Sequence, residues 1–460
     1  MSLIAVHDSI AVRLHGTRYR PKMPAINHKT VGYFMVDDPL HHPKLRPLDI
    51  RRVDQGGQQL LSLNDPLRLT DQAMLINHRQ ASVLALCDGT RDLPTLIADL
   101  SARNGIHVLL PEMEDLVDTL DENLLLEGPR FQEACQRALV AYRQAPYRKQ
   151  AMADAVYPAD AADLHRALDE FCAQAPPPDI STTSVSRPGE IVGLLTPHID
   201  YARGHEVYAG VWQQAIPSLS DYDLIVVLGT DHAGGPGKLT LTRQHYATPW
   251  GTLPTDLEVV EALIRGQGAE AALAEELHHV REHSIELALV WLHYAMQRGA
   301  DSPLSESALP PVVPILCGHM GHFIRGEGTP ETDRSFGMLL DTLRFTMESR
   351  RTLVVASGDL AHVGPAFGDA APLGAQQRAQ LKSDDDASLE AIRFGDAPAF
   401  FQGLKEDEDR RRVCGITPIY LAMQLLGNNV SGTVTDYAQC PADIDGGSLV
   451  SIAGAVWRKN

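Results

Sequence analysis

Two short apolar runs in the second half of the chain constrain its fold more than any other feature. IVGLL (191–195) and LIVVL (224–228) are continuous, rich in β-branched residues and bounded by glycine, proline or aspartate. Strands buried on both faces of a parallel sheet have this pattern. The successive runs each lead within a few residues to a histidine, His198 and His232. Because ligands bind beyond the carboxyl ends of such strands, both histidines are candidate site residues.

Further apolar runs alternate with stretches of helical periodicity downstream. This alternation is typical of a layered α/β domain, in which helices cover a sheet. We therefore predict an α/β sandwich in this part of the chain. The runs occupy residues 312–318, 352–358 and 448–457, and the helical stretches occupy residues 261–277, 284–297 and 336–350.

A proline- and serine-rich stretch at residues 173–190 separates this region from the rest of the chain. Its composition is typical of an interdomain linker. The 460 residues also exceed what one hydrophobic core usually sustains. We expect two domains, a smaller and mainly helical one at residues 1–172 and the α/β domain at residues 191–460.

The centre of the N-terminal part is predicted to form a small unit. QQLLSLND (58–65) predicts a strand, and the stretches at 77–89 and 93–105 predict helices that end at glycine. A third helix is expected at 111–128, because a proline opens it, a glycine closes it and leucines form one stripe along it.

Charge and hydropathy exclude several classes of protein. The formal net charge is -19, from 40 basic and 59 acidic residues, which argues against nucleic acid as a partner. We expect no membrane association and a cytosolic protein, since no apolar stretch approaches the roughly 20 residues of a transmembrane helix and no signal-peptide core is present. Six scattered cysteines without a CxxC motif fit reduced thiols better than a disulfide framework.

Histidine, aspartate and cysteine gather where the predicted strands end. Cys414 precedes a helical stretch, and a thiol at a helix N-terminus has a lowered pKa, which favours the thiolate that metals bind. Most free cysteines, however, are simply small buried residues. Asp359 and His362 would share a face if a helix began there. The clusters are TPHIDYARG with His198 and Asp200, GTDHAGG with Asp231 and His232, REHSIELAL with Glu282, His283 and Glu286, SGDLAH with Asp359 and His362, and VCGITPI with Cys414.

These clusters favour a mononuclear metal held by two imidazoles and one anionic ligand. The sequence lacks a GxSxG elbow, a GxGxxG after a strand, a P-loop and an HExxH motif. Two histidines and one carboxylate leave positions open on Fe(II), whereas a cysteine favours softer metals. Asp200 and Asp231 are alternative ligands or, as we favour, residues that orient the imidazoles through hydrogen bonds.

Seven motifs occur in the order seen in the Memo family, over essentially all residues after the expected linker. They are PHIDY, GTDHAGG, EHSIEL, PILCG, SGDLAH, CGITPI, and DYAQ followed by SLVSIAGAVW. The chain resembles the branch called AmmeMemoRadiSam system protein B, which shares its fold with class III (LigB-type) extradiol dioxygenases. The resemblance places the family's metal-site histidines at His198 and His232, its Asp and His pair at Asp359 and His362, its cysteine at Cys414 and the histidine of its EHS motif at His283.

The chain departs from the family pattern at two motifs. It has PHIDY where PHAGY is common, and TDH where Ser-His or His-His is usual. Memo-like proteins also present a cysteine where extradiol dioxygenases have a carboxylate, so ring cleavage does not follow from the fold. Upstream, the phrase CDGTRDLPTLIADL and its helical surroundings, about residues 51–131, resemble PqqD-like winged-helix modules, which recognise peptides beside radical-SAM enzymes.

Two functions follow as alternatives. The first is a metal-dependent oxidoreductase of the non-haem-iron type, dioxygenase-like, with Fe(II) as the expected metal and copper or zinc as alternatives. Its ligands would be His198, His232 and Cys414, and its acid/base residue would be His283 or His362, the latter with its tautomer held by Asp359. The second is a non-catalytic scaffold that presents a peptide, or a small-molecule substrate of undefined class, to a radical-SAM partner.

Overall fold

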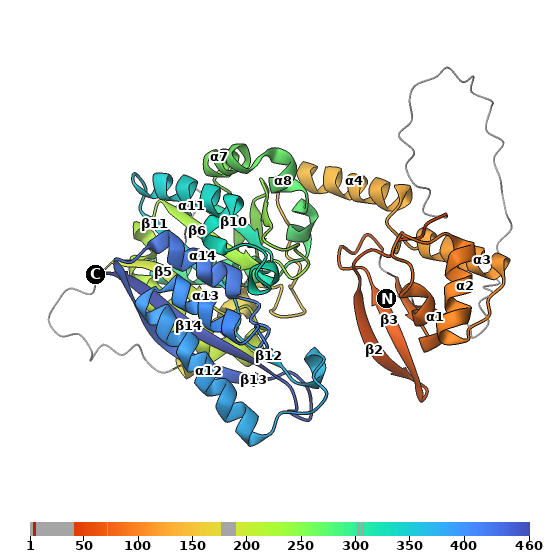
Figure 1. Cartoon of the computed structure of the whole chain (residues 1–460). Coiled ribbons are helices and arrows are strands. Elements are labelled where there is room, and N and C mark those ends of the chain that lie inside the picture. Colours follow the sequence, from red (N-terminus) through yellow and green to blue (C-terminus); the bar gives the residue numbers. More distant parts are fainter. Residues whose placement is uncertain (1–2, 6–40, 71, 176–189, 301–303, 305–307) are drawn as a thin grey trace, which may run out of the picture. The chain divides into compact units, whose positions relative to one another are not determined.

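The computed structural model describes residues 3–5, 41–70, 72–175, 190–300, 304 and 308–460. The chain forms two compact units, residues 1–141 and 142–460 (Figure 1). The division falls within helix α4 (Pro129–Gln144), upstream of the boundary expected at residue 172. Most of the expected linker, residues 176–189, lies outside the described residues.

The boundary differs from the expected one because helix α5 (Ala161–Gln174) packs in the core of the second unit. Leu164 and Leu168 of this helix are fully buried there, together with residues of the central sheet. Burial of two leucines in one core is worth several kcal/mol, at roughly 1.5–3 kcal/mol for each side chain. Residues 142–175 therefore belong to the α/β unit.

The first unit combines a small sheet with helices around its own hydrophobic core. The strand predicted at 58–65 is confirmed as β3, whereas the rest of the four-stranded sheet was not predicted. The third helix is shorter than predicted, because Leu124 adopts the left-handed conformation (φ 59°) and the chain leaves the helix at Glu122. The elements are β1 (Leu3–Ala5), β2 (Asp49–Gln55), β3 (Gln58–Asn64), β4 (Ala73–Ile76), α1 (His78–Leu84), α2 (Leu93–Asn104) and α3 (Leu110–Glu122).

The second unit is built on a mixed sheet with the order β12-β14-β5-β11-β6-β10-β7, extended by β13 on β14. The five predicted strands are all present, and β5, β11, β6 and β10 run parallel. β14 runs antiparallel to β5, so the sheet is mixed. The strands are β5 (Ile191–Thr196), β6 (Leu224–Thr230), β7 (Leu239–Leu241), β10 (Val312–Cys317), β11 (Thr352–Ser357), β12 (His362–Val363), β13 (Val430–Pro441) and β14 (Leu449–Lys459), with a separate hairpin of β8 (Tyr246–Thr248) and β9 (Gly251–Leu253).

Helices cover both faces of this sheet, which confirms the α/β class (Figure 1). Successive residues of a strand point to opposite faces, so Leu194 packs in one core and Leu195 in the other. This is why the strands are apolar at every position. One face packs against α5, α6 (Tyr201–Ala215) and α9 (Ser284–Gly299), and the other packs against α7 (Leu257–Gln267), α8 (Ala269–Leu273), α10 (Gly321–Ile324), α11 (Arg334–Met347), α12 (Ala375–Phe394), α13 (Ala397–Glu406) and α14 (Ile416–Leu426).

Two sequence expectations about this unit need correction. The helix predicted at 261–277 is interrupted at Gly268, whose φ of 89° ends α7 before α8 begins. Asp359 and His362 do not start a helix, because His362 begins the short strand β12, which pairs with β14. Among the residues that the structure describes, no helix is long and apolar enough to cross a membrane.

Candidate metal site

The carboxyl ends of three parallel strands bring the candidate residues together. β11 lies between β5 and β6, so Asp359, which follows β11, stands between the segments that carry His198 and His232. The backbone N–H of His198 donates to Asp359 Oδ1 at 2.8 Å. The two histidines therefore follow successive strands that are not neighbours in the sheet, yet their ring centroids are 5.0 Å apart.

Cys414 joins the site from the turn before α14. Its Sγ lies 3.2 Å from His198 Nε2. Two glycines allow this turn to approach the end of β11, since a Cβ on Gly358 would lie 2.6 Å from Gly415 Cα. The N–H of Gly415 also donates to the carbonyl of Asp359 at 2.9 Å.

His283, at the N-terminus of α9, completes a group of three imidazoles. Its ring centroid is 5.2 Å from that of His198 and 4.8 Å from that of His232. One nitrogen from each ring lies within 4.8 Å of the other two, a spacing that could hold a metal ion. The structure thus brings together His198, His232, His283 and Cys414.

An acceptor oxygen lies beside Nδ1 in all three imidazoles. Nδ1 of His198 lies 3.3 Å from the carbonyl of Ser357, and Nδ1 of His232 and of His283 lie 3.0 and 3.1 Å from oxygens of Glu282. A carbonyl or an ionised carboxylate only accepts, so each Nδ1 carries the proton. In a neutral imidazole with this tautomer Nε2 carries the lone pair, as is usual for histidines that ligate metals, and Nε2 of His198 lies 3.2 Å from Cys414 Sγ.

Glu282 is the carboxylate that orients the site. It is buried, and its two oxygens also accept the backbone N–H groups of His232 (3.1 Å), His283 (2.7 Å) and Ser284 (3.0 Å). Burial raises the pKa of Glu282, but the two imidazoles outweigh it, and the pKa lies well below its usual range. The EHS motif contained this residue, but only its spacing from Glu286 drew attention in the sequence.

Asp200 and Asp231 do not orient these imidazoles, in contrast to the sequence expectation. Asp200 caps α6 and pairs with Arg203 at 2.6 Å. Asp231 is bound to Nδ1 of His278 at 2.9 Å; burial lowers the pKa of His278, but Asp231, with Glu275 and Glu282, outweighs this effect and the net pKa is raised. Asp231, His278 and Glu275 form a second group with ligand-type spacing, already linked by this hydrogen bond. Asp200 therefore pairs with a residue on the next turn of α6, and Asp231 pairs with a residue far along the chain.

His362 and Asp359 lie beside the site, but Asp359 does not hold the tautomer of His362, the role expected from the sequence. Nδ1 of His362 faces the carbonyl of Leu360 at 3.3 Å, so the main chain holds its tautomer. Asp359 instead fixes His198, and its Oδ2 is 3.8 Å from His198 Nε2. Burial lowers the pKa of His362 and raises that of Asp359.

The ligand candidates differ in their electrostatics. Burial, reinforced by the neighbouring imidazoles, lowers the pKa of His198 well below its usual range. His232 is 39% exposed; its partial desolvation lowers the pKa, but Glu282 outweighs this effect and the net pKa is raised.

Burial raises the pKa of Cys414, although His232 opposes the shift, so the lowered pKa expected at a helix start is not found. Cys414 stands one residue before the N-cap Gly415, where the helix dipole has a smaller effect on the pKa of a thiol.

A buried arginine from upstream holds the segment that carries Glu282. Arg148 donates to the carbonyls of His279 (2.7 Å) and Glu282 (2.8 Å) and pairs with Glu286, all within the core. Glu286 also accepts the hydroxyl of Tyr157 at 2.5 Å. Sequence reasoning missed this support, because residues 148–157 were assigned to a separate domain.

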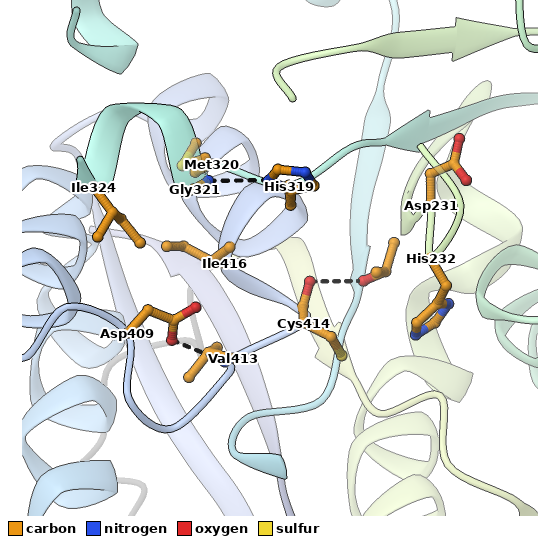
Figure 2. Close-up of a pocket in the computed structure, with 11 residues that line it drawn as sticks. Asp231, His232, His319, Met320, Gly321, Ile324, Asp409, Val413, Cys414 and Ile416 are labelled. Carbon is orange, nitrogen blue, oxygen red and sulfur yellow. Dashed lines mark hydrogen bonds between the residues drawn. The ribbon is translucent and has the colours of Figure 1, made fainter. Parts of the chain in front are cut away.

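A cleft of about 260 Å³ opens beside the site (Figure 2). His232 and Cys414 form part of its wall, so a molecule in the cleft would reach the candidate metal ligands directly. Its lining residues are Thr230, Asp231, His232, His319, Met320, Gly321, Ile324, Asp409, Val413, Cys414 and Ile416.

Comparisons with known proteins agree with this geometry. A family model described as Memo-like protein matches residues 148–456, which include Arg148 and every residue of the candidate site. A MEMO1 family protein of Aquifex aeolicus is 24% identical over 428 residues, covering 90% of this chain and 99% of that protein. MEMO1 family proteins of Methanosarcina acetivorans (26% over 263 residues, 56% of this chain and 82% of that one) and Methanopyrus kandleri (28% over 323 residues, 68% and 99%) are also similar.

We predict that Arg148→Met destabilises the second unit strongly, because it leaves the Glu286 carboxylate buried without its cation. The free energy of unfolding should fall by about 3–5 kcal/mol, measured by chemical denaturation. Arg298→Met is the matched control, since Arg298 pairs with Asp169 at the half-exposed surface and should cost at most about 1 kcal/mol. Equal losses in the two variants would show that the buried pair has no special role.

Proposed function

The chain belongs to the Memo-like protein family, and from this premise we propose that it binds one divalent metal through His198, His232 and Cys414. The observation that carries the proposal is the grouping of three imidazoles, each with a nitrogen within 4.8 Å of the other two, beside the Cys414 thiol, whose Sγ lies 3.2 Å from His198 Nε2. His283 supplies a further nitrogen within reach of the same position. The donor set therefore fits a metal.

The chemistry of the donors favours a transition metal. Imidazole suits iron, copper and zinc, and thiolate favours the softer members of this group, whereas magnesium and calcium prefer oxygen ligands. We propose Fe(II), with copper or zinc as alternatives. A bound metal would supply an open coordination position for substrate or dioxygen, and His232 and Cys414 line the adjoining cleft.

We infer an oxidoreductase of the non-haem-iron type, dioxygenase-like, on a LigB-type sandwich. The mixed sheet with helices on both faces supports the latter. His362 is suited to proton transfer, because its lowered pKa keeps the imidazole neutral and the Leu360 carbonyl on Nδ1 leaves Nε2 as the base. Asp359 acts on the geometry of His198 and contributes negative charge next to it.

The first test is the metal content of the protein after anaerobic loading with Fe(II). We expect about one ion per chain in the wild type, and at least about a tenfold lower affinity in His198→Ala and in Cys414→Ala. His165→Ala is the control, because this histidine lies on α5 beside Asp169 and outside the site. Unchanged stoichiometry in both ligand variants would refute the proposal.

The second test concerns the orienting carboxylate. Glu282→Gln keeps the size of the side chain but removes the charge that fixes Nδ1–H of two imidazoles. We expect metal affinity to fall about 10–100-fold, measured by competition with a chelator. Glu261→Gln is the matched control, since Glu261 pairs with Arg243 at the half-exposed surface and should leave the metal affinity unchanged. An unaltered affinity in Glu282→Gln would mean that the imidazoles need no orienting charge.

A second candidate function rests on the first unit, which has a hydrophobic core of its own. In this alternative the unit is PqqD-like and binds peptide, and the protein, of the AmmeMemoRadiSam system protein B type, serves as a scaffold for a radical-SAM partner. Capture of such a partner should survive substitution of the metal ligands but not deletion of residues 1–141. The deletion must end there, because removing residues up to 172 would also remove Arg148. Loss of capture with the ligand variants would oppose the scaffold.

A further inference from the structure

Four apolar side chains line the cleft beside the proposed metal ligands. They are Met320, Ile324, Val413 and Ile416, and His319 and Asp409 line the same cleft (Figure 2). Asp409 and His232 stand on opposite sides of it, with Cys414 between them in the view (Figure 2). A molecule that fills the cleft would touch the metal ligands at one end and Asp409 at the other.

The carboxylate of Asp409 has no cationic partner among the described residues. The Val413 N–H donates to its Oδ1 at 2.9 Å, and this is the one hydrogen bond that the described part of the chain gives it. Three consecutive arginines follow it, yet each pairs elsewhere. Arg410 pairs with Asp384 (2.5 Å), Arg411 with Asp385 (2.6 Å) and Arg412 with Asp369 (2.6 Å).

These ion pairs fix a loop that would otherwise be unfavourable. Glu408, Asp409 and Arg412 all adopt the left-handed backbone conformation, with φ of 55°, 47° and 54°. Such conformations cost energy in residues with a Cβ and persist where surrounding contacts enforce them. The enforced turn presents Asp409 to the cleft while its arginine neighbours point to other partners.

The cleft lining contains no lysine or arginine, and its histidines are His232 and His319. Asp231 is the other carboxylate in the lining, and it is paired with His278. Burial raises the pKa of Asp409 to about 6, and Asp407 adds to this shift, although the Val413 N–H, Arg411 and Arg412 oppose it.

We propose that this cleft binds a small primary amine, with the ammonium group on Asp409 and the apolar body directed toward His232 and Cys414. The volume supports one ring and a short chain, since a cavity of about 150 Å³ holds benzene and the cleft has about 260 Å³. This inference rests on the proposed function and names the substrate class of the same site.

The test is isothermal titration of the full-length chain, loaded with Zn(II), with 2-phenylethylammonium and its neutral analogue 2-phenylethanol. We expect the cation to bind at least about tenfold more tightly than the alcohol, as for a charge-assisted hydrogen bond. Asp409→Asn should abolish this preference. Asparagine keeps an acceptor for the Val413 N–H and tolerates the left-handed backbone.

Glu408→Gln is the matched control, because it removes the same charge from the neighbouring residue, which is outside the cleft lining and has a similar backbone conformation. It should keep the preference for the cation. Equal binding of cation and alcohol by the wild type, or an unchanged preference in Asp409→Asn, would overturn the proposal. So would tighter binding of the anionic 3-phenylpropanoate.

The metal content of each sample separates this inference from the proposed function. Asp409→Asn should bind Zn(II) as the wild type does, because Asp409 is five residues before the ligand Cys414 and is bonded to Val413. A wild type that binds Zn(II) without preferring the cation would refute the amine alone. If the wild type prefers the cation, Asp409→Asn loses this preference and no metal binds, the amine site is upheld and the proposed metal site is refuted.

Discussion

The carboxylate of Glu282, shared between two imidazoles, is the interaction on which the candidate site depends. One buried side chain holds Nδ1–H of His232 and of His283 and accepts three backbone N–H groups. Arg148 donates to the Glu282 carbonyl and holds this segment. A residue more than 130 positions upstream thus helps to position the carboxylate beside the imidazoles.

The sheet order supplies the second constraint. Insertion of β11 between β5 and β6 places Asp359 against His198, and the glycine contact between Gly358 and Gly415 lets the cysteine turn close over the strand ends. The loop before Cys414 is then held in left-handed conformations by three arginine ion pairs. The same turn therefore presents both a potential metal ligand and an unpaired carboxylate to one cleft.

The sequence predicted five strands of the second unit, β5, β6, β10, β11 and β14, because a buried strand is apolar at every position and the chain must become polar where it ends. It did not predict the directions of side chains in the loops. Asp200 lies two residues after His198, but it caps α6, while Asp231 turns to His278. The direction of a loop side chain depends on partners from other segments, and hydrophobic periodicity carries no information about these partners. Arg148 was missed for the same reason, since a single buried cation leaves no pattern.

The central claim is that a thiolate and imidazoles bind one metal at these strand ends. X-ray absorption on the Zn(II)-loaded protein tests it most directly, because sulfur and nitrogen neighbours differ in distance. We predict one sulfur at about 2.3 Å and two or three nitrogens at about 2.0–2.1 Å, with the sulfur lost in Cys414→Ala. A shell without sulfur in the wild type, or one that Cys414→Ala leaves unchanged, would contradict the claim.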